Sequence, residues 1–330
     1  MATTTTTEPK NLSVPPFAEQ DKLGPLGQRT SVLDNEAELR RALVAEFLSA
    51  SNAARAAASA AGKDDKTPNA AVHDYRKALR RARAVLSLVS CSLPKSERRA
   101  VRRALQEARR ALSIARDHAV APETLSQLAL GEVERETANA IIANATESLP
   151  PLSEIKQLLA EGAARAAAQV EALEAALPAT IEWDSVIKGV RGIYDEARRA
   201  RRAGKKNKRA FHTWRRRSKE LTYQLELLAG YAGANVAELH HEIEGVTDAQ
   251  GPAVDVIMVR DFVRTFAQGI APEAFDGLML AVDAQLDDLM RDARSAGKDA
   301  YRPAPRKFAR RLAKAVRKDL APAVEDLVTD

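Results

Sequence analysis

The sequence predicts an all-α protein built from two similar helical halves. Ala, Leu and Arg, which favour helices, dominate the 330 residues, and aromatic residues make up only 4%. No segment shows the two-residue alternation of a confident strand. A stretch around His73 recurs around His212, 139 residues later. This repeat indicates two related halves that face one another around a pseudo-twofold axis.

The chain divides at proline-rich and polar segments. Residues 1–33 hold a threonine run, four prolines and no sustained period, so we expect a disordered N-terminal arm. The first half then covers about residues 34–177 and the second about 178–328, each with four or more helices. Proline removes a backbone donor and clashes with the preceding turn. Pro122, Pro150, Pro151 and Pro178 are therefore expected at helix boundaries.

The helices are expected in a simple order along the chain. A helix over residues 34–61 precedes a polar loop and the helix that carries His73, and a third runs from about 96 to 120. In the second half, a basic helix over about 181–203 precedes the helix that carries His212. The remaining helices are expected at about 234–246, 252–268, 272–296 and 305–327.

Composition limits the classes of protein and the compartment. Charged residues make up 29% of the chain, and the net charge is +6. The single cysteine, Cys91, excludes an internal disulfide framework and a cysteine-rich zinc site, and it suits a reducing compartment. No apolar run approaches the roughly 18 residues that span a bilayer, and the N-terminus lacks the pattern of a secretion signal. We therefore expect a cytoplasmic protein.

The two repeated helices each place cations on one face. At 100° per residue, the first helix gathers its cations within a sector of about 120°, opposite an apolar face. This first sector holds His73, Arg76, Lys77, Arg80 and Arg83. The corresponding sector of the second helix holds His212, Arg215, Arg216 and Lys219. Each helix is thus expected to pack one face into a bundle and present a cationic stripe on the other.

Charge is segregated along the chain rather than mixed. Residues 76–116 hold thirteen Lys or Arg against two acidic residues, and residues 188–219 are similarly basic. A basic helix face is most often solvated surface, and that interpretation stays open. However, like charges four residues apart destabilise a helix unless an anion relieves them. Two such rows that converge on one place would bind a polyanion.

At these helices the sequence resembles the conserved-histidine α-helical domain family, abbreviated CHAD. Val72-His73-Asp74-Tyr75-Arg76 and Arg80-Arg81-Ala82-Arg83 carry the first motif. His212, Arg215, Lys219, Tyr223 and the segment Leu225-Glu226-Leu227 carry its second-half counterpart. Three further segments also resemble the family, which would cover about residues 34–328: they are Leu112 to Asp117, Glu244 to Asp248, and Tyr301 to Phe308.

The resemblance implies two four-helix bundles related by pseudo-twofold symmetry, with a basic pore or groove between them that binds inorganic polyphosphate. Arginine suits this ligand because its planar fork bonds two phosphate oxygens at once. The residues expected closest to the ligand are Arg76, Lys77, Arg80, Arg83, Arg215, Arg216 and Lys219. Two interpretations stay open for His73 and His212: they either bind phosphate or make structural hydrogen bonds at the starts of their helices. A second group on neighbouring basic helices comprises Arg102, Arg109, Arg116, Arg191, Arg198, Arg202 and Lys206. A third, on a C-terminal helix that either wraps the groove or faces water, comprises Arg306, Lys307, Arg310, Arg311 and Lys314.

Several other functions are weighed against this one. A nucleic-acid-binding protein could use phosphate contacts alone, but few aromatic residues are available for base stacking. A coat protein of polyhydroxyalkanoate or polyphosphate granules could use the Ala-rich stretches at 52–61 and 160–176. We expect no cofactor. We also expect no metal site, because His240 and His241 are adjacent, His73 and His212 are far apart, and no carboxylate with suitable spacing lies near them. We also expect no catalysis, since no phosphate-binding glycine loop of Walker type or plausible nucleophile is present.

Overall fold

The structure, a computed structural model, is all-α throughout the residues that it describes, which confirms the predicted fold class. These are residues 36–61, 68–148, 150–204 and 207–320, with only the backbone described at 113–119. The N-terminal arm at 1–33, Lys206 and the side chain of Arg116 lie outside this description. The elements are α1 (Glu36–Ala60), α2 (Pro68–Leu88), the 3₁₀ turn η3 (Val89–Cys91), α3 (Lys95–Arg110), α4 (Ser113–Gln127), α5 (Glu132–Thr146), α6 (Leu152–Ala176), α7 (Trp183–Ala203), α8 (Lys208–Ala232), α9 (Ala234–Thr265), α10 (Pro272–Ala300) and α11 (Pro305–Leu320).

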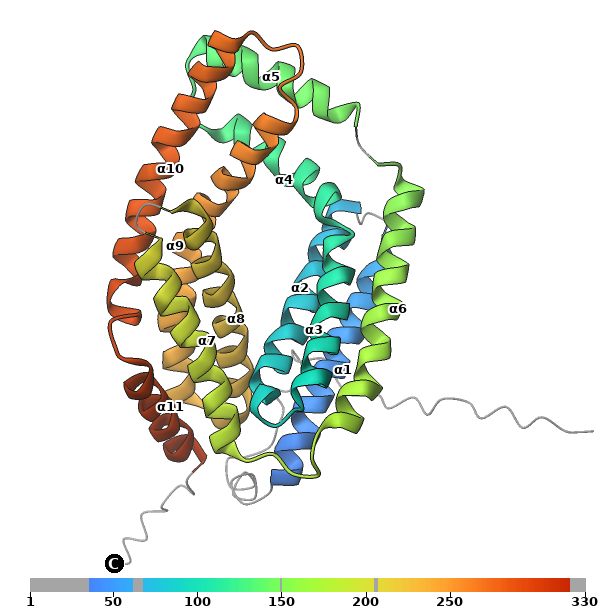
Figure 1. The fold of residues 1–330 in the computed structure, drawn as a ribbon, viewed down its shortest axis with the longest axis vertical. Helices are drawn as coiled ribbons and strands as arrows, with labels where there is room; N and C mark the ends of the chain where they lie inside the picture. The colour runs from blue at the N-terminus through green and yellow to red at the C-terminus, as the bar shows by residue number, and fades with distance from the viewer. Residues whose placement is uncertain (1–35, 62–67, 149, 205–206, 321–330) are drawn as a thin grey trace, which may run out of the picture.

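The helices form two groups that lie side by side (Figure 1). Helices α1, α2, α3 and α6 pack together in one group, and α7, α8, α9, α10 and α11 pack in the other. Helices α4 and α5 reach across, since α4 packs on α9 and α5 packs on α10. The first half of the chain therefore contributes two helices that bridge the groups. The pseudo-twofold relation between complete halves and the pore stay predictions.

The two histidine-bearing helices, α2 and α8, pack directly against each other where the groups meet. Arg81 pairs with Glu226, and Ser87 donates to Glu220. The repeat aligns Arg81 with Glu220 and Ser87 with Glu226, so the contacts are reciprocal. Reciprocal contacts of this kind are what a local twofold axis between two helices produces.

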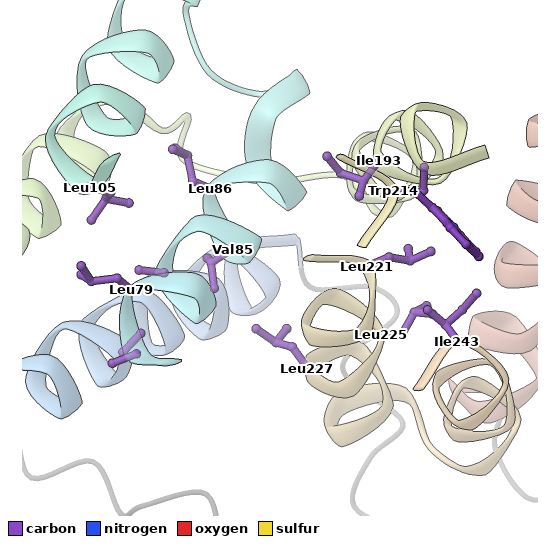
Figure 2. Close-up of a cluster of buried hydrophobic side chains, with 14 of the residues drawn as sticks. Leu79, Val85, Leu86, Leu105, Ile193, Trp214, Leu221, Leu225, Leu227 and Ile243 are labelled. Carbon is purple, nitrogen blue, oxygen red and sulfur yellow. The ribbon is translucent and has the colours of Figure 1, made fainter. Parts of the chain in front are cut away.

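Apolar side chains on both sides support this crossing. Figure 2 shows Val85 of α2 and Leu227 of α8 on the facing sides of their helices, and both belong to one cluster of buried apolar side chains. Gly189 brings α7 against the end of α2, because a Cβ at this position would lie 2.5 Å from the Leu88 carbonyl oxygen. The two groups therefore meet through close backbone contact as well as through side chains.

Two expected helix boundaries are wrong. Pro122 lies inside α4, and Pro252 lies inside α9, which joins the two helices expected at 234–246 and 252–268. Proline has no N–H, so Pro252 cannot donate to the carbonyl oxygen of Asp248, four positions earlier. Both residues are exposed, so water can donate to this carbonyl instead. The helix expected from 96 to 120 instead breaks at Ala111 and Leu112. No helix in the described ranges combines the length and the apolar character that crossing a membrane requires.

Candidate functional site

A basic pocket lies between the facing sides of α2 and α8. Its volume is about 180 Å³. Helix α2 lines one wall, α8 lines the opposite wall, and α3 and α9 complete it. The lining residues are Arg76, Arg80, Arg83, Arg109, His212, Arg215, Arg216, Lys219, Glu220, Tyr223, Gly251, Val254 and Asp255. The pocket thus joins cations from both copies of the repeated motif, which are 139 residues apart in the sequence.

Positive charge in the pocket is crowded. Seven Lys or Arg side chains line it against two carboxylates. Burial, followed by the charge of Arg83, Arg80 and other arginines, lowers the pKa of Arg109 to about 10. Burial also lowers the pKa values of Arg83, Arg215, Arg216 and Lys219, and neighbouring arginines add to each shift. The protein therefore holds these cations in an unfavourable arrangement that a bound anion would relieve.

The two pocket carboxylates neutralise this charge only in part. Glu220 is buried and accepts a hydrogen bond from Arg217 at 2.6 Å as well as the bond from Ser87. It therefore serves the contact between the helix groups. Asp255 of α9 is partly exposed, and its charge opposes the lowering of the Arg215 pKa. Asp248, also on α9, acts on Arg215 in the same direction, so Asp255 is the α9 carboxylate that both lines the pocket and acts on one of its cations.

Arg76 has a structural role at the base of the pocket. Its side chain is 4% exposed, and its guanidinium donates to the carbonyl oxygens of Arg109 at 3.2 Å and Leu112 at 3.5 Å. These carbonyls lie where α3 ends and the chain turns into α4. Arg76 therefore holds this corner in place and places Arg109 beside the pocket.

Arg215 occupies the matching position in the second copy of the motif but has a different environment. One of its terminal nitrogens is buried and makes no hydrogen bond within the described part of the chain. The other lies near Gly251, where a Cβ would be 4.0 Å away. Arg215 is thus a donor without a full set of partners, positioned in the pocket wall.

Tyr223 is the one Phe, Tyr or Trp side chain that lines the pocket among the described residues. It is 8% exposed, and the charged groups of Arg81 and Lys219 each lie 5.9 Å from its ring centroid. Cations therefore already occupy the surroundings of this ring. Tyr223 therefore offers no open ring face on which a nucleobase could stack, and the exposed imidazole of His212 is the other aromatic ring among the described lining residues.

Eight of the predicted binding residues line the pocket: Arg76, Arg80, Arg83, Arg109, His212, Arg215, Arg216 and Lys219. Arg102 lies nearby, since its charge lowers the pKa values of Arg83 and Arg216. It also belongs to an outer basic hollow on α3 with Arg99, Arg103 and Arg110. This hollow extends the positive charge of the pocket along α3.

The other predicted residues lie outside the pocket lining. His73 and Lys77 are exposed on α2, and Arg191 and Arg202 are exposed on α7. Arg198 donates to the carbonyl oxygens of Tyr301 and Arg302 at 3.1 and 3.4 Å, so it joins α7 to the α10–α11 turn. The C-terminal group on α11, which packs on α7 and α9, is exposed: Arg306, Lys307, Arg310, Arg311 and Lys314.

Five lining residues are absent from the predicted set: Glu220, Tyr223, Gly251, Val254 and Asp255. Tyr223 belongs to the second motif and Glu220 to its basic helix, so both positions could have been found from the repeated motif. The three residues from α9 carry no cation and belong to no repeated motif. Only the packing of α9 against α8 brings them to the pocket.

Comparisons with known proteins identify the family. The family model for the CHAD domain matches residues 39–264, more than half of the chain, so the chain belongs to the CHAD family. Its fold is also similar to the crystal structure of the CHAD domain from the plant Ricinus communis. The TM-score is 0.54 at 17% sequence identity, and the match covers 86% of this chain and 91% of that one. A comparison with curated proteins found no match.

Proposed function

We propose that this CHAD protein binds inorganic polyphosphate, without cleaving it, in the basic pocket between α2 and α8. The observation that supports the proposal most strongly is the convergence of seven cations from three helices on a pocket with two carboxylates. Burial and mutual repulsion lower the pKa values of five of these cations. A phosphate chain would supply both the missing hydrogen-bond acceptors and the opposing charge.

The character of the pocket favours a phosphate chain over a nucleic acid. Polyphosphate has a negative charge on every unit and no bases, so it needs cations and no stacking surface. Nucleic-acid channels of the single-stranded type instead combine cations with exposed aromatic rings. Tyr223 is too buried to provide one.

The lining residues also support binding without catalysis. None of them is a Ser, Thr or Cys that could act as a nucleophile, and the two carboxylates adjoin arginines. The arrangement stabilises the negative charge of a bound phosphate chain. We expect no phosphate release when the protein is incubated with long-chain polyphosphate.

Granule coating is less well supported. The Ala-rich stretches at 52–61 and 160–176 belong to α1 and α6, which pack against each other. Ala54, Ala57, Ala163 and Ala166 are all buried. These alanines therefore contribute to the core, and they are not available to lie on an apolar granule surface.

The test is a titration of the full chain with long-chain polyphosphate, comparing two double variants. Arg80→Gln with Lys219→Gln removes a cation from each wall of the pocket at matching positions of the motif. Lys307→Gln with Arg310→Gln removes two exposed cations from α11, outside the lining. Each lost phosphate contact costs roughly 1 kcal/mol, so we expect the pocket variant to bind about 30-fold more weakly. The α11 variant should bind within about twofold of the unmodified chain.

Two results would overturn the proposal. Equal weakening by both double variants would show that binding depends on total charge rather than on the pocket. Duplex DNA that displaces polyphosphate at equal phosphate concentration would favour a nucleic-acid-binding protein. Both variants should be checked for an unchanged melting temperature, so that loss of binding is not loss of fold.

A further inference from the structure

We propose a binding site for a divalent transition-metal ion on α9, formed by His240, His241 and Glu244. The structure brings one ligand atom from each of these side chains within 4.8 Å of the others. No metal site was expected from the sequence, because the histidines are unfavourably spaced and no carboxylate with suitable spacing was identified near them. The ligand that was missed is Glu244, one helical turn after the histidine pair.

The helix geometry explains why the three side chains converge. Residues three and four apart are neighbours on a helix surface, so Glu244 lies next to both His241 and His240. The Glu244 carboxylate is 3.3 Å from Nδ1 of His241 and 3.9 Å from Nδ1 of His240. Ligands about 2.1 Å from a tetrahedral ion are about 3.4 Å apart. The group therefore needs only small side-chain rotations to hold an ion.

Burial selects the coordinating atom of His240. Its side chain is 12% exposed, and its Nε2 is buried without a hydrogen-bond partner in the described ranges. Only Nδ1 faces Glu244, so the ring is already held with that nitrogen toward the site. His241 is 73% exposed and Glu244 is 40% exposed. An ion can therefore enter from solvent without any rearrangement of the core.

The donor set indicates the class of ion. Two imidazole nitrogens and one carboxylate oxygen suit Zn²⁺ or a related late first-row ion, whereas Mg²⁺ and Ca²⁺ prefer oxygen ligands alone. Three protein ligands leave a fourth position for water or an anion.

The test is calorimetric titration of the metal-stripped, untagged chain with Zn²⁺, together with the spectrum of its Co²⁺ complex. We expect one ion per chain, visible bands of low-coordinate Co²⁺, and binding at least about tenfold weaker in His241→Ala. This variant changes an exposed side chain, so it should fold normally. Glu238→Gln, which removes an exposed carboxylate from the same helix, is the matched control and should bind like the unmodified chain.

Three results would overturn the proposal. The first is the absence of Zn²⁺ binding. The second is unchanged binding in a variant that combines His241→Ala with Glu244→Gln. The third is binding that disappears in Cys91→Ser but not in His241→Ala. The last would assign the ion to the exposed thiol of Cys91. None of these measurements uses polyphosphate, so the metal site and the proposed function can fail independently.

Discussion

Helices α2 and α8 carry the same motif but use its arginines differently. Arg76 of α2 is buried and bonds the carbonyls of Arg109 and Leu112 at the corner between α3 and α4. Arg215, at the matching position of α8, lines the pocket with a terminal nitrogen that has no partner in the described residues. Arg76 therefore supports the corner between α3 and α4, while Arg215 leaves its charge available for a ligand.

The largest effect that we expect is a difference in stability between variants of these two arginines. Arg76→Ala should lower the free energy of unfolding by about 2–3 kcal/mol, because it leaves two carbonyls at the corner without their charged donor. Arg215→Ala should change it by less than about 1 kcal/mol, since it removes a cation that repels its neighbours. Urea unfolding of both variants measures the difference, and equal losses would contradict the division of roles.

A second comparison concerns two glycines of α7. Gly189→Ala should destabilise the protein by about 1–3 kcal/mol, because its methyl group would overlap the backbone at the end of α2. Gly192→Ala should stabilise it by about 0.5–1 kcal/mol, since nothing lies within 4 Å and alanine favours the helix. Thermal unfolding of the pair checks the prediction. A neutral Gly189→Ala would mean that the two helix groups do not meet this closely.

The residues that follow Arg76 and Arg215 in the motif, Lys77 and Arg216, should differ in their effect on polyphosphate affinity. Arg216 lines the pocket, whereas its counterpart Lys77 is exposed outside the lining. Arg216→Gln should weaken polyphosphate binding about fivefold, the value of one phosphate contact, and Lys77→Gln by less than about twofold. Direct titration measures both constants. If Lys77→Gln had the larger effect, the ligand would run along the outer face of α2.

The smallest effect that we expect comes from a carboxylate of the pocket. Asp255→Asn removes a negative charge beside Arg215 while keeping the shape of the side chain. Polyphosphate should then bind about two- to threefold more tightly at low salt, through weaker repulsion at the pocket wall. The same titration detects this change, and weaker binding by Asp255→Asn would show that Asp255 positions Arg215 rather than opposing the ligand.

The sequence predicted the motif helices better than their surroundings. Helical periodicity placed Arg80, Arg83 and Lys219 on cationic faces, and the structure brings these faces to one pocket. The same periodicity placed Arg76 on that face, yet the structure buries it, because an angle around one helix does not show that the end of α3 lies against it. Asp255 was missed for a related reason, since only tertiary packing brings α9 to the pocket.

Prolines show a second limit of sequence reasoning. Two helices were expected at about 234–246 and 252–268, but α9 spans both and continues through Pro252, because the exposed side of the helix tolerates the lost hydrogen bond. Local rules give the cost of such a residue. They do not show that α9, a helix of 32 residues, packs along α8 and α10, and that this packing outweighs the cost of the proline.

The most direct test of the central claim is the salt dependence of polyphosphate binding by the full chain and by the variant Arg80→Gln with Lys219→Gln. Affinity for a polyanion falls linearly with salt on logarithmic axes, with a slope set by the number of phosphates that the protein neutralises. We predict a slope shallower by roughly one to two units in the variant, since two contacts are lost. Identical slopes would contradict the account, because they would show that the ligand does not lie between α2 and α8.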